Sequence, residues 1–201
     1  MTRAPTRPEP AATPSAAPPQ PDSHALLARA VDEAARLLQA DGAMVYLVDG
    51  DRMRFEVDAG IRNAEAQQLI RDLSLPVGVG LFGHAVASGE VVVSGDYRRD
   101  QRFPHSPVAD RIVNVVNMRS MAAAPLIADG EVLGALGAYS SRLDGFDESG
   151  IALLRALADH AATTIANQRL IERLARSQEE LARLTDDLRS HGDELAHRVE
   201  A

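Results

Sequence analysis

The sequence predicts an α+β fold with a mainly antiparallel sheet and a long C-terminal helix. Two segments, 43–57 and 120–141, each place apolar runs on both sides of an Asp-Gly pair, which is the pattern of a β-hairpin. Helical periodicity precedes the first hairpin and follows the second. Because each hairpin joins strands that run in opposite directions, we expect most of the sheet to be antiparallel.

The composition fits one globular domain and excludes several kinds of chemistry. Of the 201 residues, 45% are hydrophobic and 25% are charged, close to the averages of folded proteins. There is no Cys, and all 21 basic residues are Arg. Disulfides, zinc-thiolate sites, iron–sulfur clusters and thioether-linked pigments are therefore excluded, as are a phosphate-binding or Schiff-base lysine.

The charge and the apolar runs limit the partners. A net charge of -8 argues against nucleic acid, which requires clustered positive charge. No apolar run approaches the roughly 18 residues of a membrane span, and prolines stand where a signal peptide would be apolar. We expect a cytoplasmic protein without a membrane span.

The chain begins with a segment that we expect to be disordered. Seven of the eleven prolines lie in residues 1–22, and no aromatic residue precedes Tyr46. Asp22 and Ser23 are good helix N-caps, and the apolar residues that follow recur with a helical period. A first helix is therefore expected up to about Asp41.

Strands and short helices are expected next. The continuous apolar run 43–48 is typical of a central strand. Met53, Phe55 and Val57 alternate with charged residues, which predicts a second strand with one face in water.

A helix is then expected over 63–73, a break at Pro76, a short helix in 81–89 and a third strand at 91–93. The polar, proline-containing segment 94–107 is expected to be a long surface loop.

The second half contains a short helix, a hairpin and a long helix. The short helix is marked by Val108, Ile112, Val115 and Val116. In the hairpin that follows, Gly134 and Gly137 indicate close backbone packing.

From Asp147 the pattern is helical to the end of the chain. The residues expected to pack on the domain are Leu153, Leu154, Leu157, Ala161 and Ile165. Further along, leucines at an interval of seven predict a coiled coil, with Leu174, Leu181, Leu188 and Leu195 on the seam and Leu170 and Leu184 at the complementary positions. Ser177 and His191 also fall on the seam and weaken it. The alternative is a lone amphipathic helix that folds back on the domain.

Three stretches of the chain resemble the signature stretches of GAF domains. They are GLFGHAVASGEVVVSGD, MRSMAAAPLIADGEVLGALGAYSS and FDESGIALLRALADHAATTIANQRL, in the family's order, and the resemblance extends from Ala25 to Leu170. It implies a sensory domain over 23–167, followed by a coiled-coil signalling helix over 168–201. The implied sheet has five or six antiparallel strands with helices on both faces. The terminal helices would cover one face and form a homodimer, and the ligand pocket would lie on the other.

The resemblance also limits the ligand. The Asn-Lys-Phe-Asp-Glu motif of the cyclic-nucleotide-binding members cannot be completed without Lys, and the absence of Cys excludes both a covalent bilin and cysteine-based reduction of methionine sulfoxide. Haem held by one His is permitted. His105 is the best-placed residue for that role and His84 a weaker one, the alternative being a His that only orders the loop between two prolines.

Two sets of residues are candidates for binding. The pocket candidates are Tyr46, Phe82, Tyr97, Phe103, His105, Ile112, Val116, Met118, Met121 and Tyr139. Among them Tyr46, Phe82, Met118, Met121 and Tyr139 could also be plain core. The candidates for binding an anion are Arg98, Arg102, Arg111 and Arg119, near Arg99, with a solvated surface as the alternative. No metal site is expected apart from His105 with haem, and His160 is expected to be structural.

Together with these residues, the resemblance implies a non-enzymatic sensory module that binds a small molecule, such as haem or a small anion. A dimeric coiled coil would relay the signal to a downstream domain such as a histidine kinase. The alternative is a stand-alone protein–protein interaction module with an empty pocket. A small-molecule enzyme is a third hypothesis and would depend on His105 and nearby Asp residues, because no nucleophile elbow, metal-ligand spacing or phosphate loop is present.

Overall fold

The computed structural model describes residues 23–199, so the predicted tail lies outside the described residues. The elements follow the predicted order, with a few additions. They are α1 (Ser23–Leu37), β1 (Gly42–Asp49), β2 (Arg52–Ala59), α2 (Ala64–Arg71), β3 (Ser74–Pro76), α3 (Gly80–Ser88), β4 (Val92–Ser94), the 3-10 turn η1 (Tyr97–Arg99), α4 (Pro107–Val116), β5 (Ser120–Ala128), β6 (Glu131–Ser140) and α5 (Glu148–Val199).

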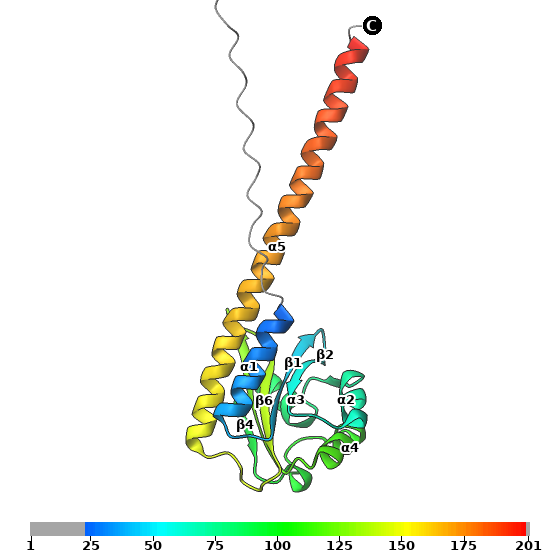
Figure 1. Cartoon of the computed structure of the whole chain (residues 1–201). Helices are drawn as coiled ribbons and strands as arrows, with labels where there is room; N and C mark the ends of the chain where they lie inside the picture. The colour runs from blue at the N-terminus through cyan, green and yellow to red at the C-terminus, as the bar shows by residue number, and fades with distance from the viewer. Residues whose placement is uncertain (1–22, 200–201) are drawn as a thin grey trace, which may run out of the picture.

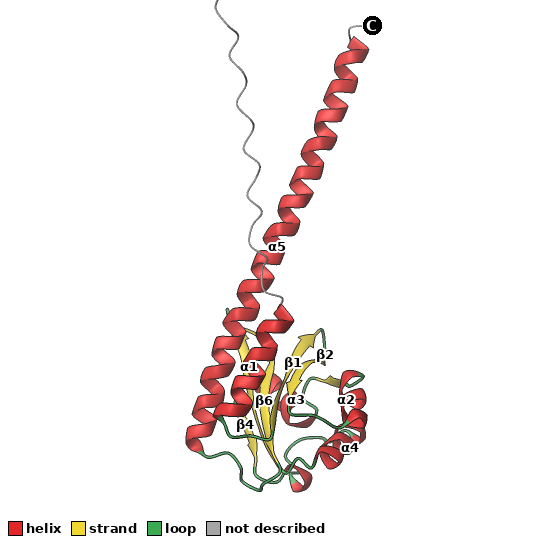
Figure 2. Cartoon of the chain, viewed as in Figure 1, coloured by secondary structure: helices red, strands yellow, loops and turns green. Residues whose placement is uncertain are grey.

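The strands form one sheet, as Figures 1 and 2 show. Within residues 23–199 it has six strands in the order β3-β2-β1-β6-β5-β4, and every neighbouring pair is antiparallel. The two predicted hairpins are β1–β2 and β5–β6, and they meet where β1 pairs with β6. The α+β fold with a six-stranded antiparallel sheet is thus confirmed.

Helices cover both faces of the sheet. Side chains of β1 alternate between two hydrophobic clusters, with Met44 and Tyr46 in one and Ala43 and Val45 in the other. Helices α1 and α5 lie side by side on the Val45 face, while α2, α3 and α4 lie on the Tyr46 face (Figure 1). A strand buried on both faces explains why 43–48 is continuously apolar.

A β-bulge corrects the expectation for β2. Val45 pairs with Val57 and Tyr46 pairs with Phe55, which leaves Glu56 as an extra residue. Val57 therefore packs in the cluster under α1, whereas Met53 packs in the cluster on the opposite face. The prediction that Met53, Phe55 and Val57 share one face, with water on the other, was wrong for this reason.

Two other expectations need correction. A short edge strand, β3, occupies the segment where Pro76 was expected to break the chain, since an edge strand tolerates proline. The segment 94–107 is more than a surface loop, because Tyr97 and Phe103 are each only 3% exposed. The predicted short helix is α4, in which Ile112, Val115 and Val116 pack against the core as expected. Val108 is exposed, however, and Val113 is buried.

Helix α5 is confirmed as one continuous helix, which leaves the domain after its first turns (Figure 1). Leu154, Ala161 and Ile165 are buried against the sheet, as predicted. Beyond them the described leucines of the predicted seam are exposed in the single chain, namely Leu170, Leu174, Leu181, Leu184 and Leu188. Leu195 and the side chain of His191 lie outside the described side chains, and the coiled-coil pairing stays a prediction. Among the helices of residues 23–199, none combines the length and apolar character needed to cross a membrane.

Candidate functional site

A small cavity lies between the sheet and the helices of the Tyr46 face. Its volume is about 40 Å³. A buried water needs roughly 10–15 Å³ by the same kind of measure, and sites for drug-sized ligands reach about 300 Å³ or more. The cavity therefore has room for only a few heavy atoms.

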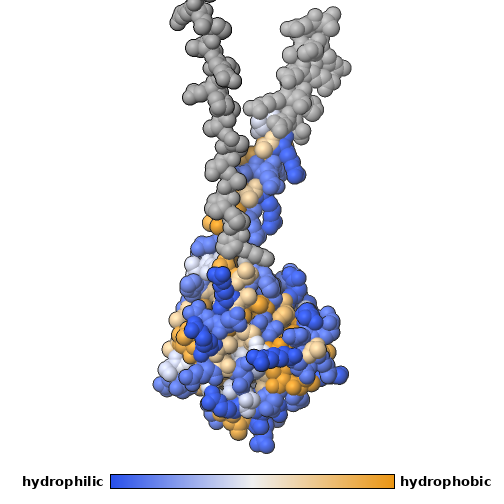
Figure 3. Space-filling view, viewed as in Figure 1, coloured by the Kyte–Doolittle hydropathy of each residue, from blue (hydrophilic) through white to orange (hydrophobic). Residues whose placement is uncertain are grey.

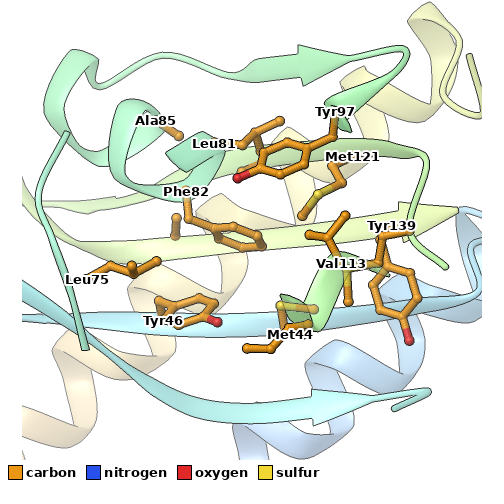
Figure 4. Close-up of a cluster of buried hydrophobic side chains, with 14 of the residues drawn as sticks. Met44, Tyr46, Leu75, Leu81, Phe82, Ala85, Tyr97, Val113, Met121 and Tyr139 are labelled. Atoms are coloured by element: carbon orange, nitrogen blue, oxygen red, sulfur yellow. The ribbon is translucent and has the colours of Figure 1, made fainter. Parts of the chain in front are cut away.

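The sequence predicted six residues of the cavity wall. They are Tyr46, Phe82, Tyr97, Ile112, Met118 and Met121. Figure 4 shows the ring of Phe82 above Tyr46 of β1, with Leu81 and Tyr97 nearby. The ring centroids of Tyr46 and Phe82 are 5.0 Å apart. The other lining residues, which the sequence did not single out, are Met44, Ile70, Leu73, Leu75, Gly80, Leu81, Ala109 and Val113.

The missed residues left a partial signal in the sequence. Met44 is two residues before Tyr46 on the same strand, so strand alternation could have placed it on the same face. Ile70 and Leu73 belong to the predicted helix over 63–73, but only the packed structure shows that this helix ends against the cavity. Nearly the whole wall is apolar or aromatic, and no lining side chain carries a charge.

Four predicted pocket residues do not line the cavity. Val116 is half-buried and packs against the surrounding cluster. The hydroxyl of Tyr139 points away from the other rings in Figure 4, and this buried group has no partner within the described residues. Phe103 and His105 lie outside the cavity wall, beside Tyr97.

Phe103, His105 and Tyr97 form a group of rings in mutual contact, in which Phe103 stacks on the other two and the Tyr97–His105 pair is tilted. The centroids of Tyr97 and His105 are 4.7 Å apart, those of Tyr97 and Phe103 are 5.7 Å apart, and those of Phe103 and His105 are 5.9 Å apart. His84 of α3 lies 5.9 Å from Phe103 by the same measure. Tyr97 is the member that lines the cavity, so the other rings support its outer side.

Both ring nitrogens of His105 have partners. Nδ1 lies 2.8 Å from Oδ1 of Asp110, and Nε2 lies 2.7 Å from the carbonyl oxygen of Asp100. Burial lowers the pKa of His105, but the hydrogen bonds to Asp110 and to the Asp100 carbonyl outweigh it and leave the pKa above its ordinary value.

This arrangement does not fit a haem. An iron ligand needs a free ring nitrogen, and both nitrogens of His105 are already hydrogen-bonded. The cavity of about 40 Å³ is also far too small for a porphyrin.

Each arginine of the predicted anion site has a partner inside the protein. Arg102 pairs with Asp100, Arg111 with Glu65 and Arg119 with Asp96. The Arg102 and Arg119 guanidinium groups hold the pKa values of Asp100 and Asp96 below their usual range.

The fourth arginine, Arg98, donates to the side-chain oxygen of Asn117 at 3.0 Å, and Arg99 lies 3.8 Å from Asp96. An anion would have to compete with these contacts. They tie the short helices to one another, as the Arg111–Glu65 pair does between α4 and α2.

Comparison with known proteins agrees with this fold. The family model of the GAF domain matches residues 20–166. No curated protein matches the chain.

Many solved structures are similar. A GAF domain of a phosphoenolpyruvate-protein phosphotransferase from Coxiella burnetii superposes with a TM-score of 0.64 at 22% identity, covering 77% of this chain and 89% of that one. Free methionine-R-sulfoxide reductase from Neisseria meningitidis gives a TM-score of 0.61 at 26% identity, covering 76% and 83%. A domain from Sinorhizobium meliloti, provisionally assigned to a two-component sensor histidine kinase, gives 0.56 at 20% identity, covering 75% and 93%. The chain therefore belongs to the GAF domain family.

Proposed function

We propose that this chain is a sensory GAF module that binds a small uncharged molecule in the cavity and relays its state through a homodimer of α5. The observation that carries the proposal is the path of α5. Its first part packs on the sheet, and the same helix continues beyond the domain with a row of exposed leucines. At about 1.5 Å per residue, its 52 residues span roughly 78 Å.

The exposed leucines support pairing with a second copy. Leu170, Leu174, Leu181 and Leu184 are each more than half exposed, and their spacing places them on one side of the helix. Figure 3 shows hydrophobic patches between hydrophilic side chains on the part of α5 that leaves the domain. A row of this kind is costly in water and becomes buried when two helices pair.

A groove between α1 and α5 supports the same mode of pairing. It has a volume of about 190 Å³ and is lined by Leu26, Leu27, Arg29, Ala30, Glu33, Leu157, His160, Ala161 and Thr164. His160 lies two heptads before Leu174, so the groove and the leucine row lie along one side of α5. A second copy in parallel orientation would cover both and would place both domains at the same end of the dimer.

The cavity wall supports a ligand that is small and uncharged. The wall offers apolar and aromatic side chains, without a charged group to hold a carboxylate or phosphate. Burial raises the pKa values of Tyr46 and Tyr97, so their hydroxyls stay neutral hydrogen-bonding groups. A larger ligand would need the helices over the cavity to move.

We propose a non-enzymatic role. Some structural neighbours are free methionine-R-sulfoxide reductases. The cysteine chemistry implied for such members has no counterpart in a chain without Cys. The downstream partner we propose is a signalling domain such as a histidine kinase, in line with the neighbour from Sinorhizobium meliloti.

A second candidate function is an interaction module with an empty pocket. The size of the cavity favours it, because about 40 Å³ is far below the roughly 300 Å³ at which sites for drug-sized ligands begin. The long helix would then serve the binding of a partner helix.

Native mass spectrometry of the purified protein tests the dimer. We expect a dimer for the wild type and a monomer for Leu181→Glu, which places a charge on the seam. Glu179→Gln, on the opposite side of the helix, is the matched control and should stay dimeric. A wild-type monomer at micromolar concentration, or a Leu181→Glu dimer as stable as the control, would contradict the relay.

A comparison of purified and refolded protein tests the ligand. A bound small molecule adds mass to the native spectrum, and it raises stability by about 2.7 kcal/mol when present at a hundredfold excess over its Kd. Protein that has been denatured, desalted and refolded should then melt at a lower temperature. A bare native mass together with identical melting curves would contradict ligand binding and support the empty-pocket candidate.

A further inference from the structure

The imidazole ring of His105 lies between two hydrogen-bond acceptors. Nδ1 faces a carboxylate oxygen of Asp110 at 2.8 Å, and Nε2 faces the main-chain carbonyl oxygen of Asp100 at 2.7 Å. A neutral imidazole carries one N–H, and its other nitrogen is an acceptor. One of the two contacts would then bring two acceptors together without a hydrogen.

Only the protonated ring satisfies both contacts, because an imidazolium donates from both nitrogens. The contact to Asp110 is then also a charge-assisted hydrogen bond, which is stronger than a neutral one. The described conformation is therefore that of the protonated state.

The two partners of His105 belong to segments that cover the cavity. Asp110 lies in the first turn of α4, which contributes Ala109, Ile112 and Val113 to the cavity wall. Asp100 directly follows η1, which contributes Tyr97.

The residue before His105 adds a third link. The carbonyl of Pro104 accepts a 2.8 Å hydrogen bond from the amide of Gly80, at the start of α3. The ring of His105 thus connects η1 with α4, and the Pro104 carbonyl connects the same segment to α3.

We propose that His105 is a proton-binding site through which the module senses pH: the bound proton holds η1 and α4 together over the cavity, and its release loosens this cover. The proposal depends on the proposed function only in taking the cavity as the sensory site. The proton is the ligand here, whether or not a small molecule also binds.

The charged groups around His105 favour the proton. Asp110 faces it directly, and the carboxylate of Asp100 is nearby but is paired with Arg102. From η1, the neutral ring of Tyr97 packs on the imidazole, while Arg98 and Arg99 are bonded to Asn117 and Asp96.

From α3, His84 approaches the ring group through Phe103. The side chain of His105 is 26% exposed, so a proton can exchange with solvent.

The sign of the effect follows from linkage. The pKa of His105 in the closed structure lies above the ordinary value of 6.5, so the stabilising effect of the proton is complete below about pH 6.5. It is lost as the pH rises through the pKa of the closed state. Each unit by which the closed-state pKa exceeds the open-state pKa gives about a tenfold change in the opening equilibrium.

Two measurements on the whole chain test the proposal. The first is an NMR titration of the His105 imidazole in the wild type and in Asp110→Asn. We expect a midpoint above 6.5 in the wild type and a lower one in the variant, because the carboxylate charge is gone. A wild-type midpoint at or below this ordinary value would overturn the proposal without any variant having to fold.

The second measurement is amide hydrogen exchange, corrected for the intrinsic effect of pH. Protection of the amides in 107–118 should fall as the pH rises through the His105 midpoint, while protection of the amides in the central strand β6 should not change. In His105→Gln this pH dependence should disappear, whereas His197→Gln, near the end of α5 and off the leucine seam, should keep it. Protection of 107–118 that is independent of pH in the wild type, or that changes equally in His105→Gln, would overturn the proposal. Neither measurement uses an added ligand. Failure of the pH proposal can therefore be told apart from failure of the proposed small-molecule site.

Discussion

The phenol ring of Tyr97 lies between the cavity and the imidazole of His105. One side of the ring lines the cavity, and its centroid lies 4.7 Å from that of His105. A residue of the apolar wall is thus in direct contact with a group that gains and loses a proton. Because close-packed rings have little room to move independently, a displacement of the His105 ring requires a displacement of the Tyr97 ring, and the reverse.

Burial of the tyrosines leads to a prediction that needs no variant. The chain has three tyrosines, Tyr46, Tyr97 and Tyr139, and burial raises the pKa of each above the ordinary value of 10. The folded protein should therefore show no tyrosinate absorbance at the ordinary tyrosine pKa of about 10. Stability should fall as the pH rises above about 10, because only the unfolded chain loses these protons.

An alkaline titration followed by absorbance and circular dichroism makes this test. We expect one cooperative rise in absorbance that coincides with unfolding, and an ordinary titration near about pH 10 in denaturant as the control. A tyrosine that ionises at this ordinary pH in the native fold would show that the cavity wall is open to water.

The β-bulge at Glu56 predicts an unequal response to two deletions. Removal of Glu56 leaves Val57 opposite Val45 and Phe55 opposite Tyr46, so each side chain keeps its face of the sheet. The deletion of Glu56 should lower the free energy of unfolding by about 1 kcal/mol, a typical value for a single mutation. Removal of Arg54 moves the fully buried Met53 to the other face, and loss of that burial should cost about 1.5–3 kcal/mol.

Urea unfolding of both deletion variants decides between these outcomes. If the Glu56 deletion destabilises as much as the Arg54 deletion, the bulge has a role in shaping the sheet beyond its register.

Close packing of Gly137 against Phe82 predicts a rescue. A Cβ atom at Gly137 would overlap the ring of Phe82 and would lie 2.8 Å from the main-chain oxygen of Ala122, so Gly137→Ala should cost about 1–3 kcal/mol. A substitution of Phe82 can relieve only the first of these contacts. Phe82→Leu in the same chain should recover part of this loss, with a coupling of about 0.5–3 kcal/mol.

Gly134 supplies the control for this double-mutant cycle. A Cβ atom there would meet the main-chain oxygen of Tyr46, which no side-chain substitution removes. Gly134→Ala should therefore destabilise the protein with no rescue by Phe82→Leu. Additive effects of Gly137→Ala and Phe82→Leu would contradict the described contact.

Local patterns were enough to predict the hairpins and the close approach at Gly137. The Asp129-Gly130 turn fixes β5 beside β6, and both turn residues have positive φ, as such turns require. Gly137 was expected to pack closely against a neighbouring group, but the sequence did not identify that group as the ring of Phe82. Both sequence patterns, the Asp-Gly pair and the glycine within a strand, lie within a few residues of the turn or close contact that they predict.

Long-range contacts explain what the sequence did not predict. β3 exists because the edge of β2 offers unpaired backbone groups, and Arg52 Nε also donates to the hydroxyl of Ser74 at 2.8 Å. Some partners of the arginines are distant in sequence, such as Glu65 for Arg111 and Asp96 for Arg119, and could not be identified without the fold. One of the two hydrogen-bond partners of His105 is the main-chain carbonyl of Asp100. Every residue has such a carbonyl, so the residue types in the sequence could not predict this contact.

The most direct test of the sensory dimer uses the absence of cysteine in the chain. Ser177→Cys introduces one thiol on the seam of α5, and Glu179→Cys introduces one on the opposite side of the helix. In a parallel, in-register dimer the seam thiols of the two copies face each other, and their Cα atoms come within the separation of about 4.4–6.8 Å that a disulfide requires. We predict rapid covalent dimers under mild oxidation for Ser177→Cys and few for Glu179→Cys. Equal cross-linking of the two variants, or none in either, would contradict the account.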